Sequence, residues 1–98
     1  MSCGAPAGGV ALAEVGNEAV IAGVVRRDGE PVQGAYVRLL DSSGEFAAEV
    51  PTDEDGNFRF FAAPGPWTVR ALAPGGVSAS GEAVAERGSI ASVDLDVA

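Results

Sequence analysis

The chain has 98 residues and a net charge of −8, which comes from fourteen carboxylates and six arginines, with no lysine and no histidine. This acidic balance argues against a nucleic-acid partner, because phosphate backbones require a concentrated cationic surface. The missing histidine removes the usual general base and metal ligand near neutral pH. The sequence also shows no catalytic triad, no cysteine cluster and no glycine-rich phosphate loop, so we expect no enzymatic activity, no metal and no cofactor. No apolar run approaches the roughly 20 residues that cross a bilayer, and no secretory signal is visible. We therefore expect a cytoplasmic protein without a membrane partner.

Residues 1–17 are the first predicted region, and most of them are alanine, glycine, serine or proline. They show no sustained period of 2 or 3.6, so the sequence predicts a mobile arm. The arm carries Cys3, the only cysteine of the chain. A single cysteine cannot form an internal disulfide, which fits a reducing compartment.

Residues 18–98 are predicted to form one all-β domain, a small antiparallel β-sandwich of about seven strands. Short β-rich runs alternate with turn residues at intervals of about ten, which is the spacing of such folds. The runs occupy residues 18–27, 34–40, 45–50, 57–62, 67–72, 76–85 and 89–98. We expect consecutive strands to pair as antiparallel hairpins, with the small-residue run 76–85 at an edge.

Alternation with a period of 2 predicts which side chains face the core of this sandwich. The expected core residues are Ile21, Val25, Val37, Leu39, Phe46, Phe58, Phe60, Trp67, Val69, Val93 and Leu95. Gly23 lies inside the first strand, where glycine ordinarily weakens pairing, so we expect a bulge or a close backbone approach there.

The segment DEDGN, residues 53–57, has two interpretations. Oxygen ligands at alternate positions before a glycine resemble the start of a calcium loop. However, position 64, where a loop that begins at Asp53 would place its distal glutamate, is proline. A β-turn with Gly56 in a positive-φ conformation is the simpler interpretation, and we expect no metal site.

Five residues alternate outward and form the candidate protein-binding surface: Tyr36, Arg38, Arg59, Phe61 and Arg70. If their strands share a sheet, half of the arginines lie on one face with two aromatic rings, as in surfaces that anchor partners or small anions. The alternative is cross-strand pairing, in which a hairpin at the DEDGN turn sets Arg59 opposite Glu49. Because Phe60 and Phe61 point to opposite faces, we expect Phe61 to stay exposed and to contribute to an interface.

Three segments, IAGVVRRDGEPVQGAYVRLLDSSG, TDEDGNFRF and PGPWTVRAL, resemble the carboxypeptidase regulatory-like domains. The correspondence runs from Ile21 to about Leu72. The matching residues are Ile21, Gly23, Val25, Pro31, Gly34, Asp53, Gly56, Phe58, Gly65 and Trp67. The resemblance implies a prealbumin-like (transthyretin-like) sandwich, and such modules are noncatalytic appendages in most contexts.

The whole chain, including MSCGAP, RLLDSSGEF and FRFFAAPG, also resembles a family of small actinobacterial proteins of unknown activity. That family is often labelled as sulfur-metabolism proteins, because its members are encoded beside thiosulfate sulfurtransferases of the rhodanese type. The resemblance implies a noncatalytic accessory protein that is a partner, or a sulfur acceptor, of such an enzyme.

Cys3 is the candidate sulfur acceptor under this interpretation. A thiol does sulfur chemistry as a thiolate, which a nearby cation favours, and the terminal ammonium lies one or two residues away. The alternative is a structural or protein-binding module in which Cys3 is an inert thiol. Association into a homo-oligomer is left open by the sequence.

Overall fold

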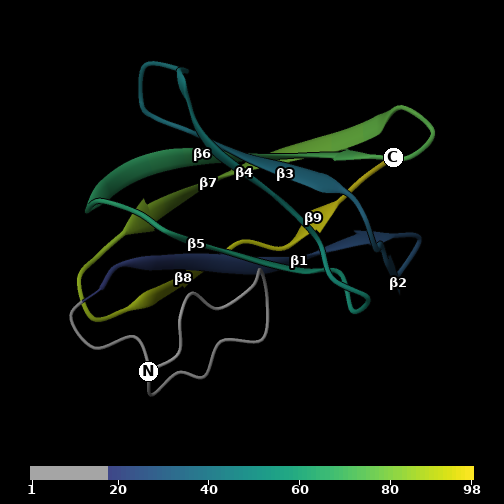
Figure 1. Cartoon of the computed structure of the whole chain (residues 1–98), viewed down its shortest axis with the longest axis horizontal. Coiled ribbons are helices and arrows are strands. Elements are labelled where there is room, and N and C mark those ends of the chain that lie inside the picture. Colours follow the sequence, from purple (N-terminus) through teal and green to yellow (C-terminus); the bar gives the residue numbers. More distant parts are fainter. Residues whose placement is uncertain (1–17) are drawn as a thin grey trace.

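The computed structural model describes residues 18–98, which form two β-sheets packed face to face (Figure 1). This part of the chain contains strands and turns, and no helix. The strands are β1 (Val20–Arg27), β2 (Glu30–Pro31), β3 (Tyr36–Leu40), β4 (Phe46–Pro51), β5 (Asn57–Phe61), β6 (Gly65–Ala73), β7 (Val77–Ala85), β8 (Ile90–Ser92) and β9 (Leu95–Asp96). The predicted all-β sandwich is confirmed.

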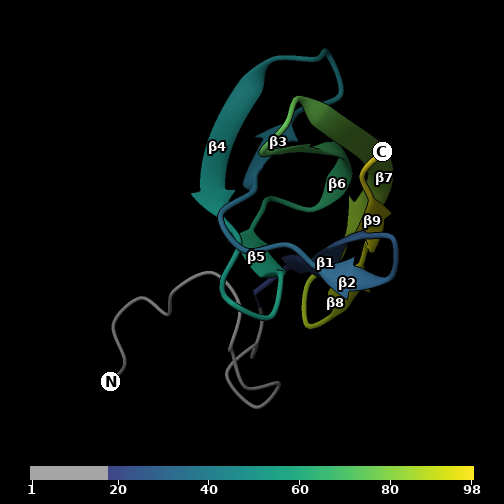
Figure 2. The same cartoon turned by 90° about the vertical axis from the view of Figure 1, so that its right-hand side faces the viewer.

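The nine strands divide into a four-stranded sheet and a five-stranded sheet. The four-stranded sheet has the order β4-β3-β6-β7 and is antiparallel throughout, with β7 at an edge as predicted. The five-stranded sheet is built on β1, which pairs with β2 and β5 in the antiparallel sense and with β8 and β9 in the parallel sense. Figure 2 shows the two layers end-on, with β3, β4 and β6 above β1, β2 and β5.

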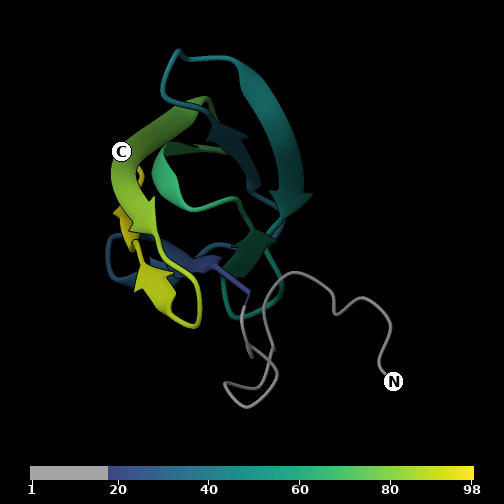
Figure 3. The same ribbon diagram turned by 90° about the vertical axis from the view of Figure 1, so that its left-hand side faces the viewer.

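Among the predicted runs, pairing of consecutive strands as hairpins is correct for β3 with β4 and for β6 with β7. Such pairing fails between β1 and β3, which lie in different sheets, and at β5, which pairs with β1 and not with β4 or β6. It is wrong for the C-terminal strands, since β8 and β9 lie parallel to β1. Parallel strands need a long crossover connection, and here the four-stranded sheet lies within that connection. The same crossover brings β7 beside β8 and β9, which closes one side of the sandwich (Figure 3).

The core lies between the two sheets and is formed by side chains that alternate inward along each strand. Nine of the predicted core residues are buried: Ile21, Val25, Val37, Leu39, Phe58, Phe60, Val69, Val93 and Leu95. Trp67 packs against this cluster while its indole N–H donates to the Ala63 carbonyl oxygen at 2.8 Å.

Phe46 was expected in the core, but its side chain is 61% exposed. The cause is a β-bulge between β3 and β4: Leu39 lies opposite Ala48, whereas Leu40 lies opposite Phe46. Ala47 is therefore the extra residue of the bulge. A one-residue shift in register places the side chains on the far side of the bulge, here Phe46, on the opposite face of the sheet. Phe46 accordingly shares the outer face with Leu40.

Gly23 makes the predicted close backbone approach. A Cβ atom at this position would lie 2.6 Å from the carbonyl carbon of Val93 and 2.9 Å from Cζ of Phe58, closer than van der Waals contact allows. The segment between β8 and β9 thus rests directly on β1. Beside this contact, the Val24 N–H donates to the Asp94 carboxylate at 3.1 Å, which supplies an acceptor where the β-ladder is interrupted.

Polar side chains fix the turns that join these strands. Between β3 and β4, the Asp41 carboxylate accepts hydrogen bonds from the Ser43 hydroxyl at 2.7 Å and from the backbone N–H groups of Glu45 and Ser43 at 2.9 Å. These donors, with the Ser43 hydroxyl first, hold the pKa of Asp41 below its ordinary value. Between β1 and β2, Asp28 and Gly29 have φ angles of 55° and 82°, as a tight two-residue hairpin turn requires.

We predict that Gly23→Ala lowers the free energy of unfolding by about 2 kcal/mol or more, because the new methyl group meets backbone that cannot move aside. Gly81→Ala is the matched control, since its Cβ would meet the side-chain atoms Val93 Cγ1 at 3.1 Å and Leu95 Cδ2 at 3.2 Å. We expect it to cost less than about 1 kcal/mol. Urea unfolding of both variants measures the difference, and equal losses would contradict the backbone contact.

Candidate functional site

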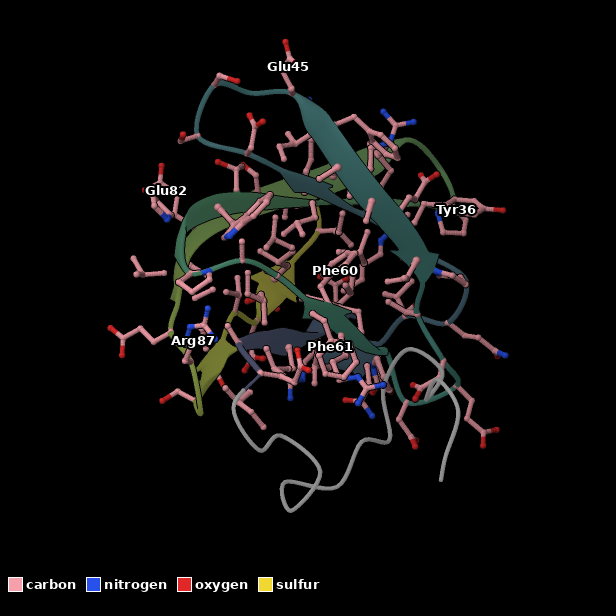
Figure 4. All side chains as sticks on the ribbon, turned by 60° about the vertical axis from the view of Figure 1, so that its left-hand side comes forward. Tyr36, Glu45, Phe60, Phe61, Glu82 and Arg87 are labelled. Atoms are coloured by element: carbon pink, nitrogen blue, oxygen red, sulfur yellow. The ribbon has the colours of Figure 1, made fainter. Side chains whose placement is uncertain are left out.

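Tyr36, Arg38 and Arg70, three of the five predicted surface residues, come together on the outer face of the four-stranded sheet. On β3, Val37 and Leu39 face the core, so Tyr36 and Arg38 face outward. The β3–β6 register places Arg38 directly opposite Arg70. Tyr36, which is 56% exposed, projects away from the core at one end of the sheet (Figure 4). We call this outer face of β4, β3, β6 and β7 the arginine face.

Arg59 and Phe61 do not belong to the arginine face. Both lie on β5, which pairs with β1 in the five-stranded sheet, so the five predicted residues are divided between opposite sides of the sandwich. The prediction of one continuous surface is therefore wrong. That prediction required all of the strands to lie in one sheet. Alternation along a strand identifies its outward residues, but it does not decide which of two sheets the strand joins.

Arg59 is also buried, with only 5% of its surface exposed. Its guanidinium carbon lies 4.8 Å from the ring centroid of Phe61, which is the geometry of a cation–π contact. The expected alternative partner, Glu49, lies on β4 and pairs with Arg38 instead. Phe61 is half exposed, as predicted.

The charges on the arginine face are unbalanced at its centre. Arg38 Nε donates to Glu49 Oε2 at 3.2 Å, and both side chains remain partly exposed. Among residues 18–98, ion pairs join Arg26 to Asp94 and Arg38 to Glu49, and neither includes Arg70. On its other side, toward β7, Arg70 lies opposite Ser80. One row of the sheet therefore holds two cations and one anion, although the whole chain is strongly acidic.

Apolar side chains lie on both sides of this charged row. On one side Tyr36 lies opposite Leu72, and on the other side, two residues beyond Arg38 on β3, Leu40 lies opposite Phe46. The alternation argument missed Phe46, because the segment EFAAEV gives no sign of the bulge at Ala47. A bulge is visible in a sequence only when it carries a marker such as glycine, and this one does not.

A depression of about 410 Å³ lies near the other end of the arginine face, where β6 runs beside β7. Its lining residues are Ser42, Pro66, Trp67, Thr68, Glu82, Ala83 and Val84. Figure 4 shows Glu82 at the surface of this region. Val84 is 60% exposed and extends the apolar part of the surface.

The DEDGN segment forms a turn. The Asp53 carboxylate accepts hydrogen bonds from the backbone N–H groups of Asp55 and Asn57, each at 2.9 Å, and Gly56 has a φ of 77°. The turn interpretation is confirmed. Within the described range, no group of three or more histidine, cysteine, aspartate or glutamate side chains is arranged to hold a metal ion.

Cys3, the candidate sulfur acceptor, lies outside the described residues, as does the whole predicted arm. In residues 18–98, no helix is long and apolar enough to cross a membrane.

We predict that Phe61→Ser lowers the free energy of unfolding by about 1 kcal/mol, because it removes a half-exposed ring and one cation–π contact. Phe60→Ser is the comparison, since Phe60 is only 4% exposed, and we expect it to cost about 3 to 5 kcal/mol. Thermal unfolding of both variants checks the assignment of faces on β5. A large loss for Phe61→Ser would show that this side of the sheet is structural.

Comparison with known proteins places the chain among uncharacterised relatives. A family described as "Protein of unknown function (DUF1416)" matches residues 3–97. Two uncharacterised proteins of Mycobacterium tuberculosis H37Rv, Rv0814c and Rv3118, are each 48% identical over 99 residues, which cover 97% of this chain and 96% of each relative. An uncharacterised protein of Mycolicibacterium smegmatis is 62% identical over 60 residues, which cover 60% of this chain and 67% of that protein.

Among solved structures, the chain is similar to the dioxygenase domain of a dioxygenase carbohydrate-binding protein fusion from Streptomyces sp. SirexAA-E. The TM-score is 0.62, the identity is 14%, and the alignment covers 83% of this chain and 79% of that domain. At this identity the likeness shows a shared fold alone. The family match and the two Mycobacterium tuberculosis relatives span nearly the whole chain, which therefore belongs to the DUF1416 family.

Proposed function

We propose that this protein is a noncatalytic binding module that recognises a protein partner through the arginine face. The observation that carries the proposal is the placement of Arg38 directly opposite Arg70 with one carboxylate beside them. Like charges directly opposite each other on neighbouring strands destabilise a sheet. A feature that opposes the stability of the fold is better explained by recognition than by folding.

The surroundings of the arginine pair support a protein as the partner. Tyrosine and arginine are enriched at the centres of protein interfaces, where each combines a large contact area with directional hydrogen bonding. Tyr36 and Phe46 are both more than half exposed and lie on the same face as the pair. The noncatalytic part of the proposal rests on residue types, since the chain has no histidine to act as a general base.

A photocrosslinking amino acid at position 36, introduced into the protein in its own cells, tests this proposal. We expect it to form a covalent adduct with a protein that mass spectrometry identifies and that binds the purified chain. Position 61 is the matched control, because Phe61 is 50% exposed, close to the 56% of Tyr36, but lies on the opposite sheet. Adducts of equal yield at both positions, or none at position 36, would contradict the proposal.

We further propose that this partner is a rhodanese-type thiosulfate sulfurtransferase and that Cys3 accepts its sulfur. Support comes from the resemblance to proteins encoded beside such enzymes, and from the presence of one thiol that falls within the family match. The Cys3 thiolate would attack the outer sulfur of the enzyme's cysteine persulfide. The sulfur–sulfur bond of the enzyme breaks, its cysteine leaves as a thiolate, and Cys3 becomes the persulfide.

Incubation of the purified protein with a sulfur-loaded rhodanese tests the transfer. One acquired sulfur adds roughly 32 Da to the intact mass and is removed by thiol reduction. Cys3→Ser should acquire none while it still binds the enzyme. An equal adduct on Cys3→Ser, or no adduct from a donor that is active on cyanide, would leave Cys3 without this role and the binding module as the remaining function.

A further inference from the structure

We infer that Arg38 and Arg70 together bind an aspartate or glutamate side chain that a partner protein presents from an acidic segment with apolar neighbours. This inference rests on the proposed function, because it assigns the chemistry recognised by the arginine face. Planar guanidinium groups match carboxylates in a two-point geometry that a lysine ammonium cannot reproduce.

The contacts of the two arginines favour a carboxylate as the ligand. Directly opposed residues on antiparallel strands have Cβ atoms about 5 Å apart, so both guanidinium groups can reach one ligand. Glu49 accepts only from Nε of Arg38, at 3.2 Å, which keeps the terminal nitrogens of Arg38 accessible from the partly exposed surface. Arg70 is exposed and has Ser80, a neutral residue, as its neighbour on β7.

Charge complementarity identifies the face at which an acidic segment would bind. The chain carries a net charge of −8, so most of its surface repels carboxylates, and the arginine pair is a local exception. A polyanion such as nucleic acid would need several more cations along its backbone, whereas a protein segment with one or two carboxylates does not. Glu49 on β4 and Glu82 on β7 limit the cationic area to the centre of the sheet.

The apolar residues define what should flank the recognised carboxylate. Tyr36 and Leu72 lie next to the arginine row on one side, and Leu40 and Phe46 lie next to it on the other. Apolar contacts around a charged pair exclude water and strengthen its hydrogen bonds. The expected ligand is therefore a segment in which hydrophobic residues stand close to an aspartate or glutamate.

The test begins with selection of random peptides displayed on phage against the immobilised full chain. We expect the enriched peptides to contain an acidic residue beside apolar ones. The affinity of a selected peptide, measured by fluorescence anisotropy, should fall about tenfold with Arg70→Thr, and equally when its acidic residue is changed to the amide. Enriched peptides without an acidic residue, or unchanged binding by Arg70→Thr, would overturn the inference.

Two further variants separate recognition from a structural role. Arg70→Thr should leave thermal stability equal or higher, because it removes a like-charge contact and introduces a residue favoured in strands. Glu49→Gln should strengthen binding of the acidic peptide severalfold, since it removes a carboxylate that competes for Arg38. Weaker binding by Glu49→Gln would contradict the inference, and Arg70→Gln replaces the threonine variant if the latter fails to fold.

The outcomes also separate this inference from the proposed function. If Tyr36→Ser abolishes peptide binding and Arg70→Thr does not, the face binds proteins but not through a carboxylate. If neither substitution weakens the binding of any peptide or protein partner, both this inference and the proposed function fail. Sedimentation of the wild-type chain tests whether the occupant is a second copy instead: self-association that Arg70→Thr removes would overturn the assignment to a different protein.

Discussion

The contact between the backbone of Gly23 and the carbonyl group of Val93 determines how the rest of this sandwich is arranged. It lets the segment between β8 and β9 rest on β1, and a methyl group at position 23 would prevent that. Val93 and Leu95 can then enter the core, while Asp94 accepts a hydrogen bond from the Val24 N–H. As a result β1 is paired along both edges, and the five-stranded sheet closes against β7.

The outer side of the four-stranded sheet carries residues that the stability of the fold alone would not favour. A strand pair chosen for stability would place opposite charges, or β-branched residues, across from each other. The protein instead places Arg38 opposite Arg70 and surrounds them with exposed rings. The proposed recognition of a carboxylate gives a physical reason for both features, because the partner's carboxylate would supply the second counterion.

Much of the fold could be predicted from local patterns, because turn residues and alternation report on each strand separately. Gly23 was informative for the same reason, since glycine inside a strand implies that something occupies the place of a side chain. Local patterns do not show which strands share a sheet. Arg59 and Arg70 alternate outward in the same way, yet they lie on opposite sheets, and only long-range pairing decides this. The bulge at Ala47 was hidden because alanine fits either face.

The pairing of the first strand with the last ones also determines when the fold can be completed. Val20 lies beside Ile90, and nearly the whole domain separates them in the chain. A nascent chain that has not yet reached β8 can form the antiparallel four-stranded sheet, but β1 then keeps one edge without its partner strands. Folding of such topologies is slow, because distant segments must meet before their contacts stabilise them. Until β8 and β9 reach β1, this unpaired strand edge can pair with other chains, so the late pairing is the step of folding at which aggregation competes.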